Sequence, residues 1–173
     1  MHTRRRASRG GRTTRGPISR FARNGGRSLY SNILIGLNES AEALRALRRA
    51  IHLAATFHAT LTAVAVTPSL PLYAAYAAAL GADTHQIMED DQHASFAKLL
   101  EMARTEANQH DIKLETVLSS GRVTDSLLEA VRANHIDLLV FGIHPGHGIR
   151  GFLLSGTAHE LAEGARCDVL GVH

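Results

Sequence analysis

The sequence has no tryptophan and one cysteine, and it lacks a long apolar run. Because Cys167 stands alone, no disulfide can form within the chain, and a reducing compartment, the cytoplasm, is expected. The longest uninterrupted apolar run, residues 72–80, has nine residues. A transmembrane helix needs about 20. No apolar segment typical of a secretory signal follows the basic start of the chain. We therefore expect no membrane association.

Aromatic residues are also few, with three tyrosines and five phenylalanines among 173 residues. The hydrophobic fraction is nevertheless 45%, so the chain can bury one core, and that core must be mainly aliphatic. These proportions predict a single domain.

Acidic residues are absent from residues 1–30, which hold nine arginines. Residues 31–173 hold all sixteen acids and ten basic residues, a formal charge of −6. We predict a disordered Arg-rich tail over 1–30 and a folded domain over 31–173. The tail composition is typical of organellar transit peptides and equally of arms that bind nucleic acid. A third interpretation is a solvated tail, or residues upstream of the true start.

Strand and helix patterns alternate along the rest of the chain. Apolar or alternating runs predict strands over residues 31–37, 59–66, 112–118, 136–141 and 167–172. Periodic apolar positions predict helices between them, with residues 68–82 as a loop that can hold a short helix. We expect Thr124 to cap one helix, and Ala94 and Ala97 to face inward from another. This alternation predicts a parallel sheet with helices on both faces.

A glycine-rich loop follows the fourth predicted strand. The stretch DLLVFGIHPGHGIRGFLLSGT, residues 137–157, runs from apolar strand to glycines and then to a helix start at Gly156-Thr157. Free backbone amides and the positive end of a helix dipole both favour an anion. Ligands of such sheets bind beyond the carboxyl ends of the strands. The loop is therefore predicted to hold phosphate, and Arg150 within it can neutralise a phosphate charge.

Four segments, in this order, resemble the universal stress protein family: ILIGLNES (33–40), VAVTP (64–68), FGIHPGHGIRGFLLSGT (141–157) and CDVLGV (167–172). The resemblance covers residues 31–173. It implies a three-layer α/β sandwich, Rossmann-like, with a five-stranded parallel sheet of order 3-2-1-4-5. It also implies a homodimer that binds ATP or AMP, with no metal beyond the Mg of the nucleotide, and that acts in stress response or signalling. The nucleotide-binding residues it implies are Leu37, Asn38, Val66, Gly142, His144, Gly146, Gly156 and Thr157.

Two positions depart from the family pattern. Gly142 lies four residues before Gly146 instead of three, because the loop holds one extra residue around Pro145. Asn38 stands where nucleotide-binding members carry Asp. A hydrogen bond to a charged group contributes about 1.5–3 kcal/mol, against about 0.5–1.5 for a neutral one. We therefore expect weaker nucleotide binding than in Asp-containing relatives, and a dimeric interaction module without nucleotide is the alternative.

The histidines allow two further hypotheses. His144 and His147 in HPGH match the signature of nucleotidyltransferases, but in those enzymes it follows the first strand, and no second basic motif is present downstream. With His159 and His173 they could also bind zinc, yet no Cys pair or His-Glu-x-x-His helix accompanies them. We predict no metal site, no catalytic residue and at most very slow ATP hydrolysis. Cys167 is expected to be a packed hydrophobe.

Overall fold

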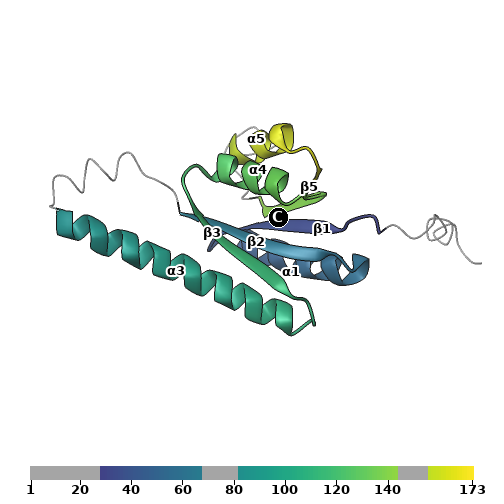
Figure 1. The fold of residues 1–173 in the computed structure, drawn as a ribbon, viewed down its shortest axis with the longest axis horizontal. Coiled ribbons are helices and arrows are strands. Elements are labelled where there is room, and N and C mark those ends of the chain that lie inside the picture. The colour runs from purple at the N-terminus through teal and green to yellow at the C-terminus, as the bar shows by residue number, and fades with distance from the viewer. Residues whose placement is uncertain (1–27, 68–81, 144–155) are drawn as a thin grey trace, which may run out of the picture.

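The computed structural model describes residues 28–67, 82–143 and 156–173. The predicted tail (1–30, except its last three residues), the predicted loop 68–82 (except Ala82) and the central part of the glycine loop lie outside these ranges. Strands and helices alternate along the described chain (Figure 1). The elements are β1 (Asn32–Leu37), α1 (Ala41–Phe57), β2 (Thr60–Thr67), α3 (Ala82–Asn108), β3 (Leu114–Ser120), α4 (Val123–Ala133), β4 (Leu138–Gly142), α5 (Gly156–Gly164) and β5 (Asp168–Val172).

The strands form one parallel five-stranded sheet in the order β3-β2-β1-β4-β5, which confirms the predicted architecture. In the central strand, Ile33 pairs with Leu61 of β2 on one side and with Leu138 of β4 on the other. All strands therefore end at the same edge of the sheet. The winding reverses next to β1, because the chain moves outward to β2 and β3 and then returns to β4.

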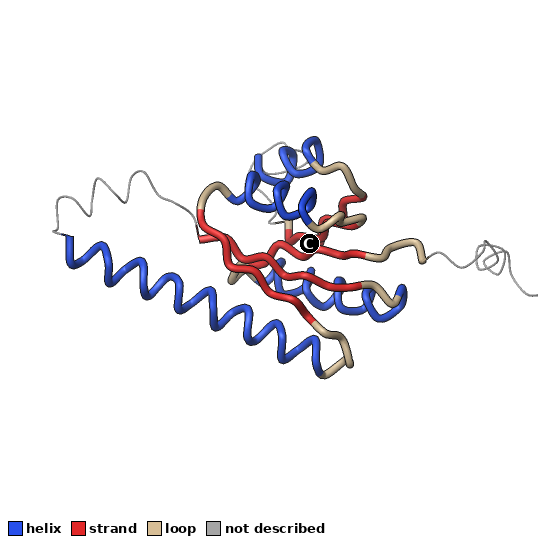
Figure 2. Tube along the Cα trace, viewed as in Figure 1, coloured by secondary structure: helices blue, strands red, loops and turns tan. Residues whose placement is uncertain are grey.

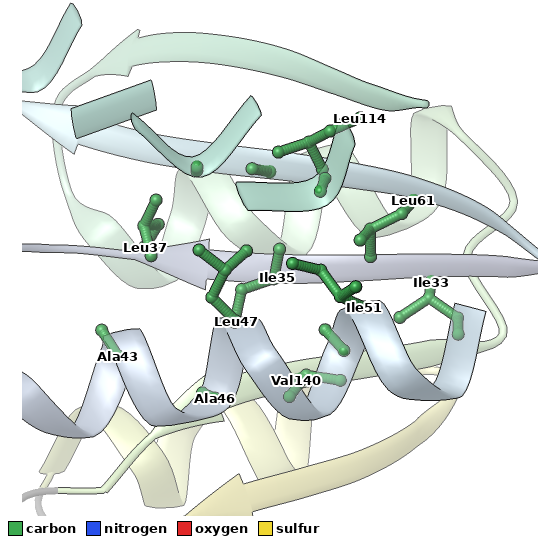
Figure 3. Close-up of a cluster of buried hydrophobic side chains, with 14 of the residues drawn as sticks. Ile33, Ile35, Leu37, Ala43, Ala46, Leu47, Ile51, Leu61, Leu114 and Val140 are labelled. Carbon is green, nitrogen blue, oxygen red and sulfur yellow. The ribbon is translucent and has the colours of Figure 1, made fainter. Parts of the chain in front are cut away.

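The central strands are buried because helices cover both faces of the sheet (Figure 2). Helices α1 and α3 pack on one face, and α4 and α5 pack on the other. Figure 3 shows Leu47 and Ile51 of α1 directed at Ile33 and Ile35 of β1. The core is aliphatic on both faces, with Phe141 the only buried aromatic ring among the described residues.

Helix α1 lies between β1 and β2, where the sequence predicts a helix. Ser40 is its N-cap, and the Ser40 hydroxyl accepts a hydrogen bond of 3.1 Å from the Ala43 N–H. The helix ends at Phe57, and the C-cap residue His58 adopts the left-handed conformation with φ of 53°. The loop between β1 and α1 is therefore only three residues long, and it holds Asn38 at the carboxyl edge of the sheet.

Two details of the prediction are wrong. Thr124 is the second residue of α4, and Arg122 is the N-cap, because the Thr124 hydroxyl donates to Glu160 on α5 instead of to its own helix. Ala94 and Ala97 are exposed, whereas the C-terminal half of α3 is buried through residues such as Leu100. Figure 1 shows the reason: α3 begins well beyond the end of the strands that it covers.

Candidate functional site

A cavity of about 110 Å³ opens at the carboxyl edge of the sheet. It lies where the ends of β1, β2 and β4 meet the first turns of α1, α4 and α5. This is the edge at which parallel α/β sheets bind ligands, next to the point where the winding reverses. The lining residues are Gly36, Leu37, Asn38, Ala43, Val64, Val66, Val123, Leu127, Phe141, Gly142, Thr157 and Leu161.

Most of the predicted site residues meet at this cavity. Leu37, Asn38, Val66, Gly142 and Thr157 all line it, although they come from four different elements and the β1–α1 loop. Gly156 is the first residue of α5, immediately before Thr157. The remaining two predicted residues, His144 and Gly146, lie outside the described residues, as do His147 and Arg150.

The walls of the cavity are apolar. Val64, Leu127, Phe141 and Leu161 complete them, and no titratable side chain is among the described lining residues. Small-molecule pockets usually enclose about 300–1,000 Å³. The described walls therefore enclose less space than most small-molecule pockets do. Leu127 and Phe141 were not among the residues that the sequence predicted to line the site.

Asn38 contributes the polar side chain nearest to the β1 end. Its Oδ1 accepts a 3.0 Å hydrogen bond from the Ser40 N–H, which forms a turn leading into α1. Only the oxygen of an amide can accept from N–H, so this bond fixes the orientation of the Asn38 amide. Its Nδ2 has no hydrogen-bond partner among the described residues and remains available as a donor.

The two described glycines of the predicted phosphate motif have different surroundings. A Cβ atom on Gly142 would lie 2.5 Å from the Ala43 nitrogen, so the close approach of β4 to the first turn of α1 requires glycine. A Cβ atom on Gly156 would meet no atom of the described residues within 4 Å. The open space at Gly156 adjoins the start of α5, where the first amides have no acceptor within the helix.

A polar cluster joins the two helices that flank this opening. Glu160 of α5 accepts hydrogen bonds from Arg122 (2.7 Å) and from the Thr124 hydroxyl (2.9 Å) at the start of α4. Thr124 is 5% exposed, whereas Arg122 and Glu160 remain accessible to solvent. The starts of α4 and α5 are thereby held together on one side of the cavity.

The described residues contain no group of three or more His, Cys, Asp or Glu side chains arranged to hold a metal ion. His159 lies on α5, 3.4 Å from Glu163, and the carbonyl oxygen of His173 accepts from Arg45. Cys167 is half-buried at the start of β5, and burial raises the pKa of its thiol. In the ranges that the structure describes, no helix combines the length and apolar character needed to cross a bilayer.

The sequence profile of the universal stress protein family matches residues 29–173. The chain belongs to this family. A universal stress protein of Methanocaldococcus jannaschii is 25% identical over 155 residues, covering 90% of this chain and 88% of the relative. Universal stress protein A homolog 2 of Coxiella burnetii is 28% identical over 145 residues, covering 83% and 94%.

Solved structures of the family have the same fold. Universal stress protein UspA from Lactobacillus plantarum superposes with a TM-score of 0.69 at 20% identity, covering 86% of this chain and 100% of the other. A universal stress protein in complex with cAMP has a TM-score of 0.60 at 26% identity, covering 83% and 97%. A family member from Arabidopsis thaliana with AMP bound, at 16% identity, covers 82% and 90% with a TM-score of 0.59, a likeness of fold alone.

Proposed function

We propose that this universal stress protein binds an adenine nucleotide, ATP or AMP, in the cavity at the carboxyl edge of its sheet. The observation that carries the proposal is the combination of an apolar cavity with the start of α5 at its mouth. The base would occupy the apolar part, and the phosphates would lie toward Gly156 and Thr157. Related structures that carry cAMP and AMP support this choice of ligand.

The chemistry at the mouth favours phosphate. The amides of Gly156, Thr157 and Ala158 have no acceptor within α5, and the helix dipole adds partial positive charge at that end. The Thr157 hydroxyl supplies one more donor. His144, Gly146 and any Mg²⁺ that accompanies ATP belong to the same proposal, and Asn38 would donate to the ribose or base through Nδ2.

The proposed role is that of a nucleotide-responsive stress or signalling factor in the cytoplasm rather than an enzyme. None of the described lining residues can act as a general base, because none is titratable. We also propose a homodimer. In the described sheet, β5 pairs with β4 on one side only, and its residues Val169 to Val172 are half-buried, so a second copy could cover this edge.

Calorimetric titration with ATP and with AMP tests the binding proposal. We expect saturation below millimolar nucleotide, and a protein that shows none at that concentration does not have the proposed function. Gly156→Val should remove most of the affinity and leave the melting temperature unchanged, because the new side chain has room but covers the start of α5. Ala133→Val, at the exposed far end of α4, is the control and should bind nucleotide like the wild type.

A further inference from the structure

Helices α4 and α5 lie side by side on one face of the sheet (Figure 1). At the start of α4, the Arg122 Nη2 and the Thr124 Oγ1 both donate to one carboxylate oxygen, Oε2 of Glu160. Thr124 is buried, and among the described residues Glu160 is the one side-chain acceptor for its hydroxyl. A buried hydroxyl that loses its acceptor destabilises the folded protein. This contact therefore holds the first turns of the two helices together.

A second contact fixes the separation of the helices at the other end of α5. A Cβ atom on Gly164 would lie 2.5 Å from the Leu128 Cδ1, so the backbone of α5 approaches this leucine closely. Leu161 of α5 and Leu127 of α4 belong to the same buried cluster. Helix α5 is therefore seated against α4 by packing along its length and by Glu160 near its start.

We propose that Glu160 is a positioning residue for the phosphate end of the nucleotide site, an inference that rests on the proposed function. Glu160 lies three residues after Thr157, on the same side of α5 as this cavity-lining residue. By holding the first turn of α5 against α4, it directs the free amides of Gly156 and Thr157 toward the cavity mouth. Glu160 itself does not touch the ligand.

Simple electrostatics predicts the opposite effect. A carboxylate near a bound phosphate repels it, so removal of the Glu160 charge should tighten the binding of an anion if charge alone mattered. A positioning role predicts weaker binding of ligands that carry phosphate and no effect on a ligand that lacks it. The sign of the change and its dependence on phosphate therefore separate the two roles.

The experiment compares AMP with adenosine in Glu160→Ala, Glu160→Gln and Glu163→Ala. Glu163 is the matched control, because it carries the same charge on the same helix and contacts only His159 among the described residues. In Glu160→Ala we expect the AMP dissociation constant to rise about five- to tenfold, in line with the loss of one well-placed helix-end interaction. Adenosine affinity should stay unchanged. Glu160→Gln keeps an acceptor for Thr124 and should recover most of the AMP affinity, and Glu163→Ala should bind AMP like the wild type.

Amide hydrogen exchange of residues 160–162 without nucleotide gives a second readout, because in a helix these amides donate to the carbonyls of residues 156–158 and so report on the first turn of α5. We expect faster exchange there in Glu160→Ala, but not in Glu163→Ala. AMP affinity that is unchanged or higher in Glu160→Ala overturns the positioning role, as does an equal loss for adenosine. A wild-type protein that binds neither AMP nor adenosine overturns the proposed function, and the exchange data then show separately whether Glu160 holds the start of α5.

Discussion

In the proposed nucleotide site, Asn38 would offer a hydrogen-bond donor in place of the acceptor that an aspartate would offer. Its Oδ1 is occupied by the Ser40 N–H, so only the Nδ2 group is left for a ligand. A carboxylate at this position would keep the turn with one oxygen and present the other to a ribose hydroxyl or an amine. That bond would be charge-assisted and therefore stronger.

We predict that Asn38→Asp tightens AMP binding about three- to tenfold, the difference between a charged and a neutral hydrogen bond. The increase in AMP affinity should disappear as the pH falls through the pKa of the introduced carboxyl group, which is near 4 for a free aspartate. The wild type has no carboxyl group at residue 38, so its affinity should not show this loss. Calorimetry between pH 4 and pH 8 measures both effects. Asn108→Asp, at the far end of α3, controls for added charge. Equal or weaker binding by Asn38→Asp would show that residue 38 does not face the ligand.

Tyr30 joins the start of the domain to the edge strand β5. Its hydroxyl donates a 2.9 Å hydrogen bond to Asp168 Oδ2, and its ring packs edge-on against Phe57 with centroids 5.3 Å apart. This hydrogen bond, together with burial and the negative charges of Asp168 and Asp137, raises the pKa of Tyr30. The folded protein therefore holds the phenol proton more tightly than the unfolded chain does.

It follows that the contribution of Tyr30 is present below pH 10, the ordinary pKa of tyrosine, and is lost as the pH rises through the folded pKa. Tyr30→Phe keeps the ring and removes the hydroxyl. We expect it to lower the free energy of unfolding by about 1 kcal/mol at pH 7, a value reduced by partial solvent exposure. Urea unfolding at increasing pH should show this difference shrinking above pH 10. If the difference in free energy of unfolding between the two proteins stays constant above pH 10, the hydrogen bond donated by the Tyr30 hydroxyl is not the source of the stabilisation.

At the scale of elements, the predictable parts are those determined by local pattern. Ile33 to Ile35 form an unbroken apolar run, and Ser40 precedes a periodic helix, so β1 and α1 follow from the sequence. The role of Thr124 could not be predicted in this way, because its partner Glu160 lies 36 residues further along the chain. The pattern of buried residues along α3 could not be predicted either, because the first half of this helix extends beyond the strands.

The site was predictable to a similar extent. The family resemblance implied Leu37, Asn38, Val66, Gly142 and Thr157. All five line the cavity, because chain segments that end parallel strands meet at one edge. Which side of α4 faces that edge depends on how the helix packs, so the cavity role of Val123, which is 37% exposed, was not visible. A pattern of apolar residues shows that a helix face is buried. It does not show which buried residues border an open space.

Gly142 and Gly156 give opposite predictions for the same substitution. Gly142→Ala places a methyl group against the backbone of α1, and we expect a loss of about 1–3 kcal/mol in the free energy of unfolding. Gly156→Ala meets open space in the first turn of a helix, and we expect no loss, or a gain of up to about 1 kcal/mol. Urea unfolding of the two variants measures both values. Equal destabilisation would show that the start of α5 packs more tightly than its surroundings indicate.

At the scale of the whole molecule, the chain consists of a basic segment and an acidic domain. Residues 1–27 contain nine arginines and no acid, whereas the rest has a formal charge of −6. The first described contacts begin at Ser28, whose hydroxyl donates to the Phe57 carbonyl at 2.7 Å. Ser31 and Asn32 then donate their N–H groups to the Asp137 carboxylate at 2.7 and 3.1 Å. The domain is therefore anchored by the residues that precede β1 and by the first residue of β1.

We predict that removal of residues 1–27 leaves the free energy of unfolding and the nucleotide affinity unchanged, because the contacts that anchor the start of the described domain are made by Ser28 and the residues after it. Removal of residues 1–31 also deletes the Ser28, Tyr30 and Ser31 hydrogen bonds, and should cost about 2–3 kcal/mol. Urea unfolding of the full chain and both truncated forms measures these changes. If the basic segment binds nucleic acid, the full chain should retain a labelled single strand at low salt and release it as salt rises, whereas the form lacking 1–27 should not bind it. Destabilisation by the shorter deletion would show that the Arg-rich residues form part of the folded domain.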